Sequence, residues 1–321
     1  LTKVKDRKVV LVTQESEKMN KDELIQEIKS LKKDKDALIL AHNYQIVEVQ
    51  EIADYRGDSL QLAMLASELK APKIVFCGVK FMAETAAILN PESTILLPAM
   101  DAGCPMADMI DENQLKAFKQ NYPGSPVVCY VNSSVEVKAE SDICCTSSNA
   151  VKVINSINTD KPILFVPDRN LGSWAAKQTG KNVIPWDGYC LVHQWGFTEE
   201  DVRSLKSKYP SHKLLVHPEC DPTIVKYADF VMSTGGMINW MKENDKAIIA
   251  TEIGLVEYLQ HIHPEKSIIP LSNKAICKNM KKTTLEHIYK ALKYDQYAIE
   301  VKTDIAQKAK IAIDRMLELS K

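Results

Sequence analysis

The chain has 321 residues, of which 45% are hydrophobic and 26% charged, and its 41 basic and 42 acidic side chains leave a net charge of -1. This composition is typical of a folded globular protein and excludes disordered and fibrous classes, while the balanced charge offers no global field for nucleic acid or an anionic membrane. No apolar run approaches the roughly 18 residues that cross a bilayer, and no signal-peptide core follows the charged start, so we expect a cytoplasmic protein without a membrane partner.

Eight cysteines need an explanation, because a reducing compartment makes a disulfide framework unexpected. No two of them are separated by two residues, which excludes zinc ribbons, thioredoxin-like dithiols and ferredoxin-type runs. Any one of them, taken alone, is most simply interpreted as a buried free thiol. The eight are Cys77, Cys104, Cys129, Cys144, Cys145, Cys190, Cys220 and Cys277.

The first predicted elements are a helix around residues 22–28, inside a Lys/Glu-rich extension over 1–35, and then an apolar run from Leu38. Similar runs begin at Val127 and Leu214, and each is typical of a buried strand. The three runs start a repeat, because the polar residue after each is followed by an aspartate twelve positions later and a hydroxyl five positions after that. The matched columns are His42, Tyr130 and His217; Asp54, Asp142 and Asp229; and Ser59, Ser147 and Thr234.

Each copy then continues with a helical pattern, a second buried run, another helical pattern and a third short apolar run. The second runs cover 74–77, 163–166 and 247–250, and the third runs cover 94–98, 182–185 and 267–270. A cysteine follows the third run in every copy. These cysteines are Cys104, Cys190 and Cys277, which repeat at nearly the same spacing as the other columns.

Alternating strands and helices predict βαβ units with parallel sheets. We therefore expect an α/β fold built from three small α/β repeats with parallel sheets, where length alone would favour about two domains. A C-terminal pair of helices should pack on this core. The predicted units are the N-terminal extension 1–35, the repeats 36–107, 108–192 and 193–282, and the C-terminal helices 283–321.

The three repeat cysteines should converge, because parallel strands present ligand-binding residues at their carboxyl ends. Three thiolates suit a four-iron cluster with one iron left open, or a catalytic zinc with three protein ligands. Ligation by sulfur alone favours iron–sulfur chemistry. The alternative is that the repeat merely preserves a small buried side chain, and spacing does not decide between them.

The three repeat hydroxyls each precede a helical segment, which predicts that they are N-cap residues. Helix N-termini bind carboxylates and phosphates, so three of them around one cavity would form a polyanion site, whereas plain capping would need no ligand. Acid–base candidates lie beside them. His42 and Tyr44 share one side of their strand end, as do His217 and Glu219, and His193 follows Cys190 by three residues.

These residues lie in motifs that resemble the quinolinate synthase family. The resemblance covers about residues 35–282 and is specific in combination. The motifs are Ala41-His-Asn-Tyr-Gln, Gly57-Asp-Ser, Phe81-Met-Ala-Glu-Thr-Ala, Gly103-Cys-Pro-Met-Ala-Asp, Tyr130-Val-Asn-Ser, Cys145-Thr-Ser-Ser-Asn-Ala, Pro167-Asp-Arg-Asn-Leu-Gly, His217-Pro-Glu-Cys and Ser233-Thr-Gly-Gly-Met.

The resemblance implies an enzyme of de novo NAD biosynthesis that condenses iminoaspartate with dihydroxyacetone phosphate, releasing phosphate and two waters. It implies a pseudo-threefold triplication of small three-layer α/β domains around a central iron–sulfur site. It also implies a 4Fe–4S cluster on Cys104, Cys190 and Cys277 with one open iron, and an aspartate oxidase or dehydrogenase as functional supplier of iminoaspartate. The implied catalytic residues are Tyr44, Tyr130, His193, His217 and Glu219. The implied substrate-binding residues are His42, Tyr44, Ser59, Tyr130, Asn132, Ser147, His217, Glu219 and Thr234.

One departure concerns the last cysteine. Some relatives carry a CxxCxxC run there that forms a regulatory disulfide, but Lys274 and Leu271 occupy the positions three and six before Cys277, which predicts no such switch. Two other functions stay open: a three-cysteine hydro-lyase acting on a different polycarboxylate, and an iron–sulfur sensor or electron carrier. The pocket residues disfavour a carrier, because electron transfer needs no acid–base constellation.

Overall fold

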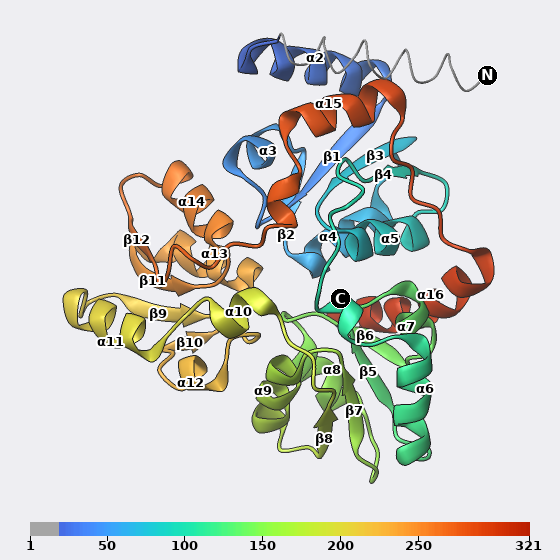
Figure 1. Ribbon diagram of the computed structural model, residues 1–321, viewed down its shortest axis with the longest axis vertical. Coiled ribbons are helices and arrows are strands. Elements are labelled where there is room, and N and C mark those ends of the chain that lie inside the picture. The colour runs from blue at the N-terminus through green and yellow to red at the C-terminus, as the bar shows by residue number, and fades with distance from the viewer. Residues whose placement is uncertain (1–18) are drawn as a thin grey trace.

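The computed structural model describes residues 19–321, so the first eighteen residues of the predicted N-terminal extension lie outside the described part. Within that part the strands form three four-stranded parallel sheets. Figure 1 shows them as three units around a common centre. The strands are β1 (Ala37–His42), β2 (Tyr55–Gly57), β3 (Lys73–Cys77), β4 (Thr94–Leu96), β5 (Val127–Tyr130), β6 (Ile143–Cys145), β7 (Ile163–Val166), β8 (Val183–Pro185), β9 (Lys213–Val216), β10 (Phe230–Val231), β11 (Lys246–Ala250) and β12 (Ser267–Pro270).

The three sheets have the same topology, with orders β2-β1-β3-β4, β6-β5-β7-β8 and β10-β9-β11-β12. Nine of these strands coincide with the apolar runs predicted from the sequence, so the triplicated α/β fold is confirmed. The other three, β2, β6 and β10, were not predicted. They are two or three residues long and lie at sheet edges, where so short a segment carries no periodicity to detect.

Helices follow the strands as the alternating pattern requires. Two 3-10 turns, Ala107–Met109 and Met280–Lys282, follow the cysteines Cys104 and Cys277. The helices are α2 (Lys21–Asp34), α3 (Val47–Ile52), α4 (Ser59–Glu68), α5 (Lys80–Leu89), α6 (Glu112–Asn121), α7 (Val135–Ala139), α8 (Ala150–Ser156), α9 (Arg169–Thr179), α10 (Leu191–Trp195), α11 (Glu199–Lys208), α12 (Pro222–Val225), α13 (Thr234–Glu243), α14 (Ile253–Ile262), α15 (Leu285–Tyr294) and α16 (Thr303–Ser320).

Successive strand residues bury opposite faces, which makes each repeat a three-layer sandwich. In the first sheet, Leu40 and Phe76 join the apolar cluster on the side of α4 and α5, whereas Ile39 and Val75 join Leu24 of α2 on the other side. The third sheet repeats this division. Because both faces are covered, the strands read as continuous apolar runs rather than alternating ones.

The C-terminal helices pack on the core. Leu285, Ile288 and Leu292 of α15 are buried in the cluster that contains Leu24 and Ile28 of α2, and Figure 1 shows the two helices side by side. Helix α16 buries Ile313 and Met316 with the first two repeats. A helix also precedes the first strand of every sheet, namely α2, α6 and α11. The domain boundaries stay a prediction.

The repeated aspartate has a structural role. Each one accepts a hydrogen bond from the backbone N–H fifteen residues earlier: Asp54 from Ile39 at 2.8 Å, Asp142 from Val127 at 2.7 Å and Asp229 from Leu214 at 2.8 Å. The backbone N–H of each aspartate returns a bond to the same residue's carbonyl. The aspartate therefore ties the edge strand to the start of the central strand in all three sheets.

We expect Asp142→Ala to lower the free energy of unfolding by about 1–2 kcal/mol, because the Val127 N–H loses a charged acceptor at a partly solvated site. Asp142→Asn keeps an acceptor oxygen and should lose less. Urea unfolding of both variants measures the difference, and equal losses would show that the hydrogen bond contributes nothing.

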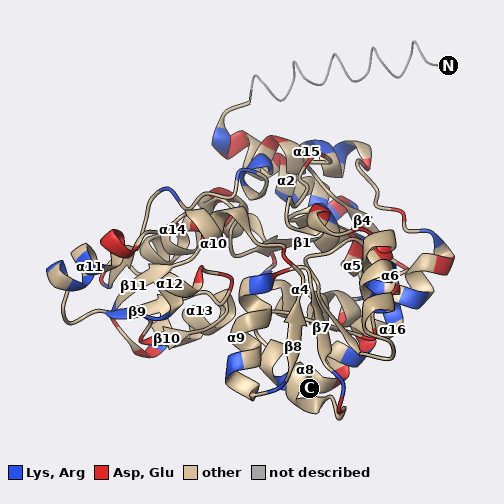
Figure 2. Cartoon of the chain, turned by 60° about the horizontal axis from the view of Figure 1, so that its bottom comes forward, with Lys and Arg blue, Asp and Glu red and all other residues tan. Residues whose placement is uncertain are grey.

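The charges are interspersed over the outer helices. In the view of Figure 2, both basic and acidic residues occur on outer helices such as α11 and α15, and α11 has its acidic residues in the first turn and its basic residues toward the end. No helix within residues 19–321 has the length and apolarity to span a membrane.

Candidate active site and metal centre

All thirteen predicted site residues line one cavity of about 660 Å³. It opens where the carboxyl ends of the three sheets face one another, so each repeat contributes equivalent side chains. From the first repeat come His42, Tyr44, Ser59 and Cys104; from the second, Tyr130, Asn132, Ser147 and Cys190; and from the third, His193, His217, Glu219, Thr234 and Cys277.

The three cysteines are held by the same backbone device. In each repeat the donor is the third residue after the second predicted strand, which is β3, β7 or β11. Its backbone N–H donates to the carbonyl oxygen of the residue two positions before the cysteine. These bonds are Lys80 to Ala102 at 2.8 Å, Arg169 to Gly188 at 2.8 Å and Ile253 to Ala275 at 2.9 Å. All eight cysteines are free thiols, and these three are half-buried while the other five are buried.

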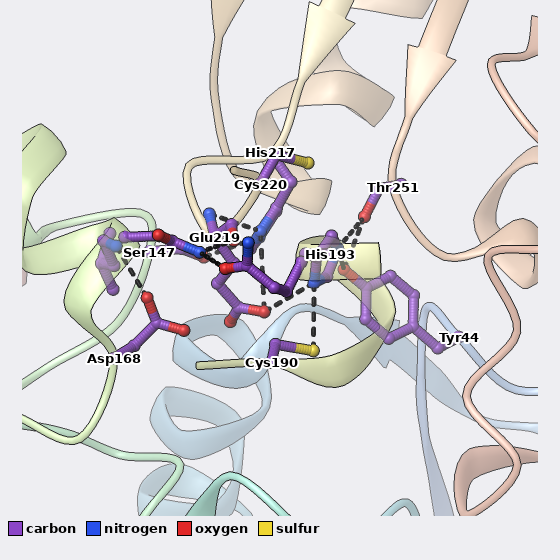
Figure 3. A network of polar contacts seen from close by, with 12 residues as sticks. Tyr44, Ser147, Asp168, Cys190, His193, His217, Glu219, Cys220 and Thr251 are labelled. Atoms are coloured by element: carbon purple, nitrogen blue, oxygen red, sulfur yellow. Dashed lines mark hydrogen bonds and ion pairs between the residues drawn. The ribbon is translucent and has the colours of Figure 1, made fainter. Parts of the chain in front are cut away.

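Glu219 is the centre of the polar network (Figure 3). Its Oε1 accepts the hydrogen bond of the Tyr130 hydroxyl, and its Oε2 lies 2.7 Å from His193 Nδ1. The His217 ring stacks on that of His193, with centroids 4.6 Å apart. Although burial acts to raise it, the pKa of Glu219 is lowered to about 2 by the neighbouring histidines and the hydrogen bonds, so Glu219 is a carboxylate at neutral pH.

The network continues from His193 to Tyr44. Thr251 Oγ1 lies 3.0 Å from His193 Nε2 and 2.7 Å from the Tyr44 hydroxyl. Hydrogen bonds therefore connect Tyr44, Thr251, His193, Glu219 and Tyr130 without a gap. Burial raises the pKa of Tyr44 and of Tyr130 well above the ordinary value, which keeps both phenols protonated. Such a connected set can move a proton across the cavity.

The predicted N-caps are wrong by one or two residues. Ser59 and Thr234 are the first residues of α4 and α13, whose caps are Asp58 and Ser233. Ser147 lies in the turn before α8, and its hydroxyl is 3.2 Å from His217 Nε2. In α4 and α13 the cap is the residue whose side-chain oxygen reaches the free N–H groups of the first turn, and this leaves the Ser59 and Thr234 hydroxyls to border the cavity.

Asp58 links all three repeats. Its Oδ1 caps α4 through the N–H groups of Leu60 and Gln61, while its Oδ2 accepts from Ser148 Oγ at 2.7 Å and Ser233 Oγ at 3.1 Å. Sequence reasoning missed Asp58, Thr251 and Glu252. The first adjoins a predicted hydroxyl, and the other two directly follow β11, so repeat alignment of strand ends could have found them.

The donor set fits an iron–sulfur cluster. Three cysteines from the three repeats border the same cavity, and burial raises the pKa of each thiol, to about 12 for Cys104. Thiolates at these positions need a cationic partner, which a metal centre supplies. Cys190, His193 and Glu219 also place potential ligand atoms within 4.8 Å of one another. We take the all-cysteine set as the better match to iron–sulfur ligation.

Burial lowers the pKa of His42 to about 4, although Asp58 and Glu219 act to raise it. An unfolded histidine titrates near pH 6.5, so below that pH the unfolded chain binds a proton that the native state refuses. The free energy of unfolding should therefore fall between pH 6.5 and about 4. His42→Asn should remove on the order of 3 kcal/mol of this fall.

Urea unfolding at several pH values between 7 and 4 measures how the free energy of unfolding of wild type and His42→Asn depends on pH. His261→Asn is the control at an exposed histidine. Identical pH profiles for wild type and His42→Asn would contradict the assignment.

Comparison with known proteins gives a consistent result. The family model described as Quinolinate synthetase A protein matches residues 26–318. The quinolinate synthase of Alkaliphilus metalliredigens is 52% identical over 304 residues, covering 94% of this chain and all of that protein. The quinolinate synthase of Methanoregula boonei is 52% identical over 298 residues, covering 92% and 98%. That of Thermococcus onnurineus is 49% identical over 304 residues, covering 94% and 100%.

Proposed function

We propose that this chain, which belongs to the quinolinate synthetase A protein family, condenses iminoaspartate with dihydroxyacetone phosphate and releases phosphate and two waters to form quinolinate for NAD biosynthesis. This reaction would class it as a condensing and dehydrating transferase. The observation that supports the proposal most is the convergence of three cysteines and a continuous Tyr–Thr–His–Glu–Tyr network on one cavity.

Both proposed substrates are anions, and the cavity wall offers neutral donors for them. Asn43 Nδ2 donates to Thr234 Oγ1 at 3.0 Å, which leaves the Thr234 hydroxyl proton for a carboxylate or phosphate oxygen. Ser59 and Ser147 border the same space. Asn132 Oδ1 is buried with no hydrogen-bond partner among the described residues, so it would accept from a substrate hydroxyl or amino group.

The network would carry the proton transfers. The Glu219 carboxylate stabilises a protonated His193 at Nδ1, and the Tyr130 hydroxyl donates to the other carboxylate oxygen. His193 Nε2 exchanges its proton with Thr251 Oγ1, which is bonded to the Tyr44 hydroxyl. A proton removed from a substrate carbon at one end can therefore be delivered to a departing hydroxyl at the other.

Cys104, Cys190 and Cys277 would hold the 4Fe–4S cluster, whose open iron supplies Lewis acidity toward substrate oxygen when it is bound. The walls of the cavity exclude bulk water from these groups, since His42, His193, His217 and Glu219 are each 5% exposed or less. Exclusion of water protects imine chemistry from hydrolysis. Because iminoaspartate is unstable in water, an aspartate oxidase or dehydrogenase would have to supply it.

An anaerobic assay tests the proposal. The reconstituted protein is given dihydroxyacetone phosphate and iminoaspartate generated in place, and quinolinate is measured. We expect quinolinate and phosphate in equal amounts. A protein that binds iron but forms no quinolinate would instead support a sensor or carrier, and turnover of another hydroxy-polycarboxylate would support a hydro-lyase. A zinc protein without iron would overturn the cluster assignment.

A further inference from the structure

A buried carboxylate, Glu252, holds the backbone of the third cysteine. It lies two residues after β11, caps α14 and is 0% exposed. Its Oε1 accepts from the Cys277 N–H at 3.0 Å, and its Oε2 accepts from the Gly254 N–H at 2.7 Å. The carboxylate thus joins the start of a helix to the loop that carries Cys277.

The counter-ion of Glu252 is Lys281. Lys281 also contacts the backbone of the segment that carries Tyr44, in the first repeat. Its Nζ lies 3.0 Å from the Glu252 carboxylate and donates to the Tyr44 carbonyl oxygen at 2.6 Å. Lys281 comes four residues after Cys277, on the 3-10 turn that follows it. Three short contacts therefore run from the Cys277 backbone, through one ion pair, to the Tyr44 backbone of the first repeat.

Gly254 leaves the space that this ion pair occupies. A Cβ at that position would collide with Lys281 Nζ and would lie 2.7 Å from the Tyr44 carbonyl oxygen and 2.9 Å from Glu252 Oε2. The ammonium group is therefore confined between a glycine, a carbonyl and a carboxylate. Such confinement fixes the direction in which Lys281 can donate.

The second repeat has a related carboxylate. Asp168 occupies the equivalent position, two residues after β7, and caps α9 by accepting from the Leu171 N–H at 2.7 Å. In the first repeat the equivalent residue is Val79. A carboxylate therefore caps the following helix at this position in two repeats, but the bond to the cysteine backbone and the ion pair to a lysine that reaches another repeat are found at Glu252.

We propose that Glu252 and Lys281 form a positioning pair that couples the Cys277 loop to the Tyr44 segment. The proposal rests on the proposed function in that it takes Cys277 as a cluster ligand. Neither residue needs to touch substrate. Residues that orient metal ligands through hydrogen bonds affect both metal retention and turnover when they are replaced. Removing one partner of a buried pair leaves the other charge uncompensated, whereas removing both does not.

The test is a double-mutant cycle with Glu252→Gln, Lys281→Met and the double variant. Iron and sulfide per chain, the electron paramagnetic resonance spectrum of the reduced cluster, and kcat and KM are measured anaerobically. We expect each single variant to lose about 10- to 100-fold in cluster retention or kcat. The double variant should retain iron better than either single variant but keep a low kcat, because Tyr44 is still unsupported.

Gly254→Ala provides a second test that changes no charge. It should displace the Lys281 ammonium and reproduce the low kcat of Lys281→Met together with an altered resonance spectrum. Lys32→Met is the matched control, since Lys32 pairs with Asp54 at 2.6 Å on the outer side of the first repeat. Its iron content and kcat should equal those of wild type.

A fold-loss in the double variant that equals the product of the two single fold-losses would overturn the coupling, as would a Gly254→Ala protein with wild-type spectrum and kcat. Iron retention and the spectrum do not depend on quinolinate formation. A wild type that binds the cluster without making quinolinate would therefore defeat the proposed function, while the cycle would still decide the role of the pair.

Discussion

Glu219→Gln should lower the turnover of quinolinate formation by about 10²- to 10⁴-fold, the range observed for loss of a general acid–base group. Glutamine has nearly the same size, and its one carbonyl oxygen can still accept from the Tyr130 hydroxyl. Its NH2 group then faces His193 Nδ1 and cannot accept from it, and the neutral side chain no longer stabilises a positive imidazole. Proton transfer between the Tyr130 and Tyr44 ends of the network would then be interrupted at its centre. The measurement is kcat under anaerobic conditions.

The cluster should remain intact in this variant, so iron per chain is measured on the same sample. Glu84→Gln is the matched control, because Glu84 is a mostly buried carboxylate of α5 that does not border the cavity. Turnover of Glu219→Gln equal to that of this control would remove Glu219 from the catalytic residues. Loss of iron together with turnover would show that Glu219 acts on the metal centre instead.

Cys190→Ser should abolish iron binding and quinolinate formation together. The serine oxygen is a harder and less polarisable donor than the thiolate that iron–sulfur centres require, and two cysteines would remain to hold the proposed four-iron cluster. Cys190 is also within 3.3 Å of His193 Nδ1, so its loss would disturb the network at the same time. Iron and sulfide analysis after anaerobic reconstitution, with absorbance near 400 nm, measures the effect.

Cys77→Ala is the control for this experiment, because Cys77 is a buried thiol inside β3 and does not border the cavity. It should bind iron at the wild-type level. If Cys190→Ser keeps its iron and forms quinolinate at the full rate, the assignment of the three cysteines is wrong.

Most of the fold could be predicted from the repeated sequence pattern. Buried parallel strands must be apolar on both faces, so nine of them are visible as continuous runs such as those beginning at Leu38 and Val127. Equal spacing of the polar residues after these runs placed equivalent side chains at equivalent strand ends. Thirteen residues predicted on that basis and from the family resemblance border one cavity.

The polar contacts between repeats could not be predicted. The Asp58 link to Ser148 and Ser233 joins residues about 90 and 175 positions apart, and the Thr251 link joins Tyr44 to His193. Side chains that make polar contacts between repeats follow no periodic sequence pattern. They also differ between repeats, since one equivalent position is occupied by Val79, Asp168 and Glu252. The role of such a side chain depends on which partner faces it, and the partner comes from another repeat.

Length, composition and spacing by themselves therefore determined a neutral, triplicated α/β chain in which one cysteine per repeat follows the third strand. They did so because strand burial and repeat equivalence are written into residue type and order. Only the tertiary structure decided that the aspartate of each repeat ties strands together, that Asp58 and Ser233 take the cap positions, and that Glu252 and Lys281 join the Cys277 loop to Tyr44. Hydrogen bonds and ion pairs act over about 3 Å, and only folding brings such distant residues that close.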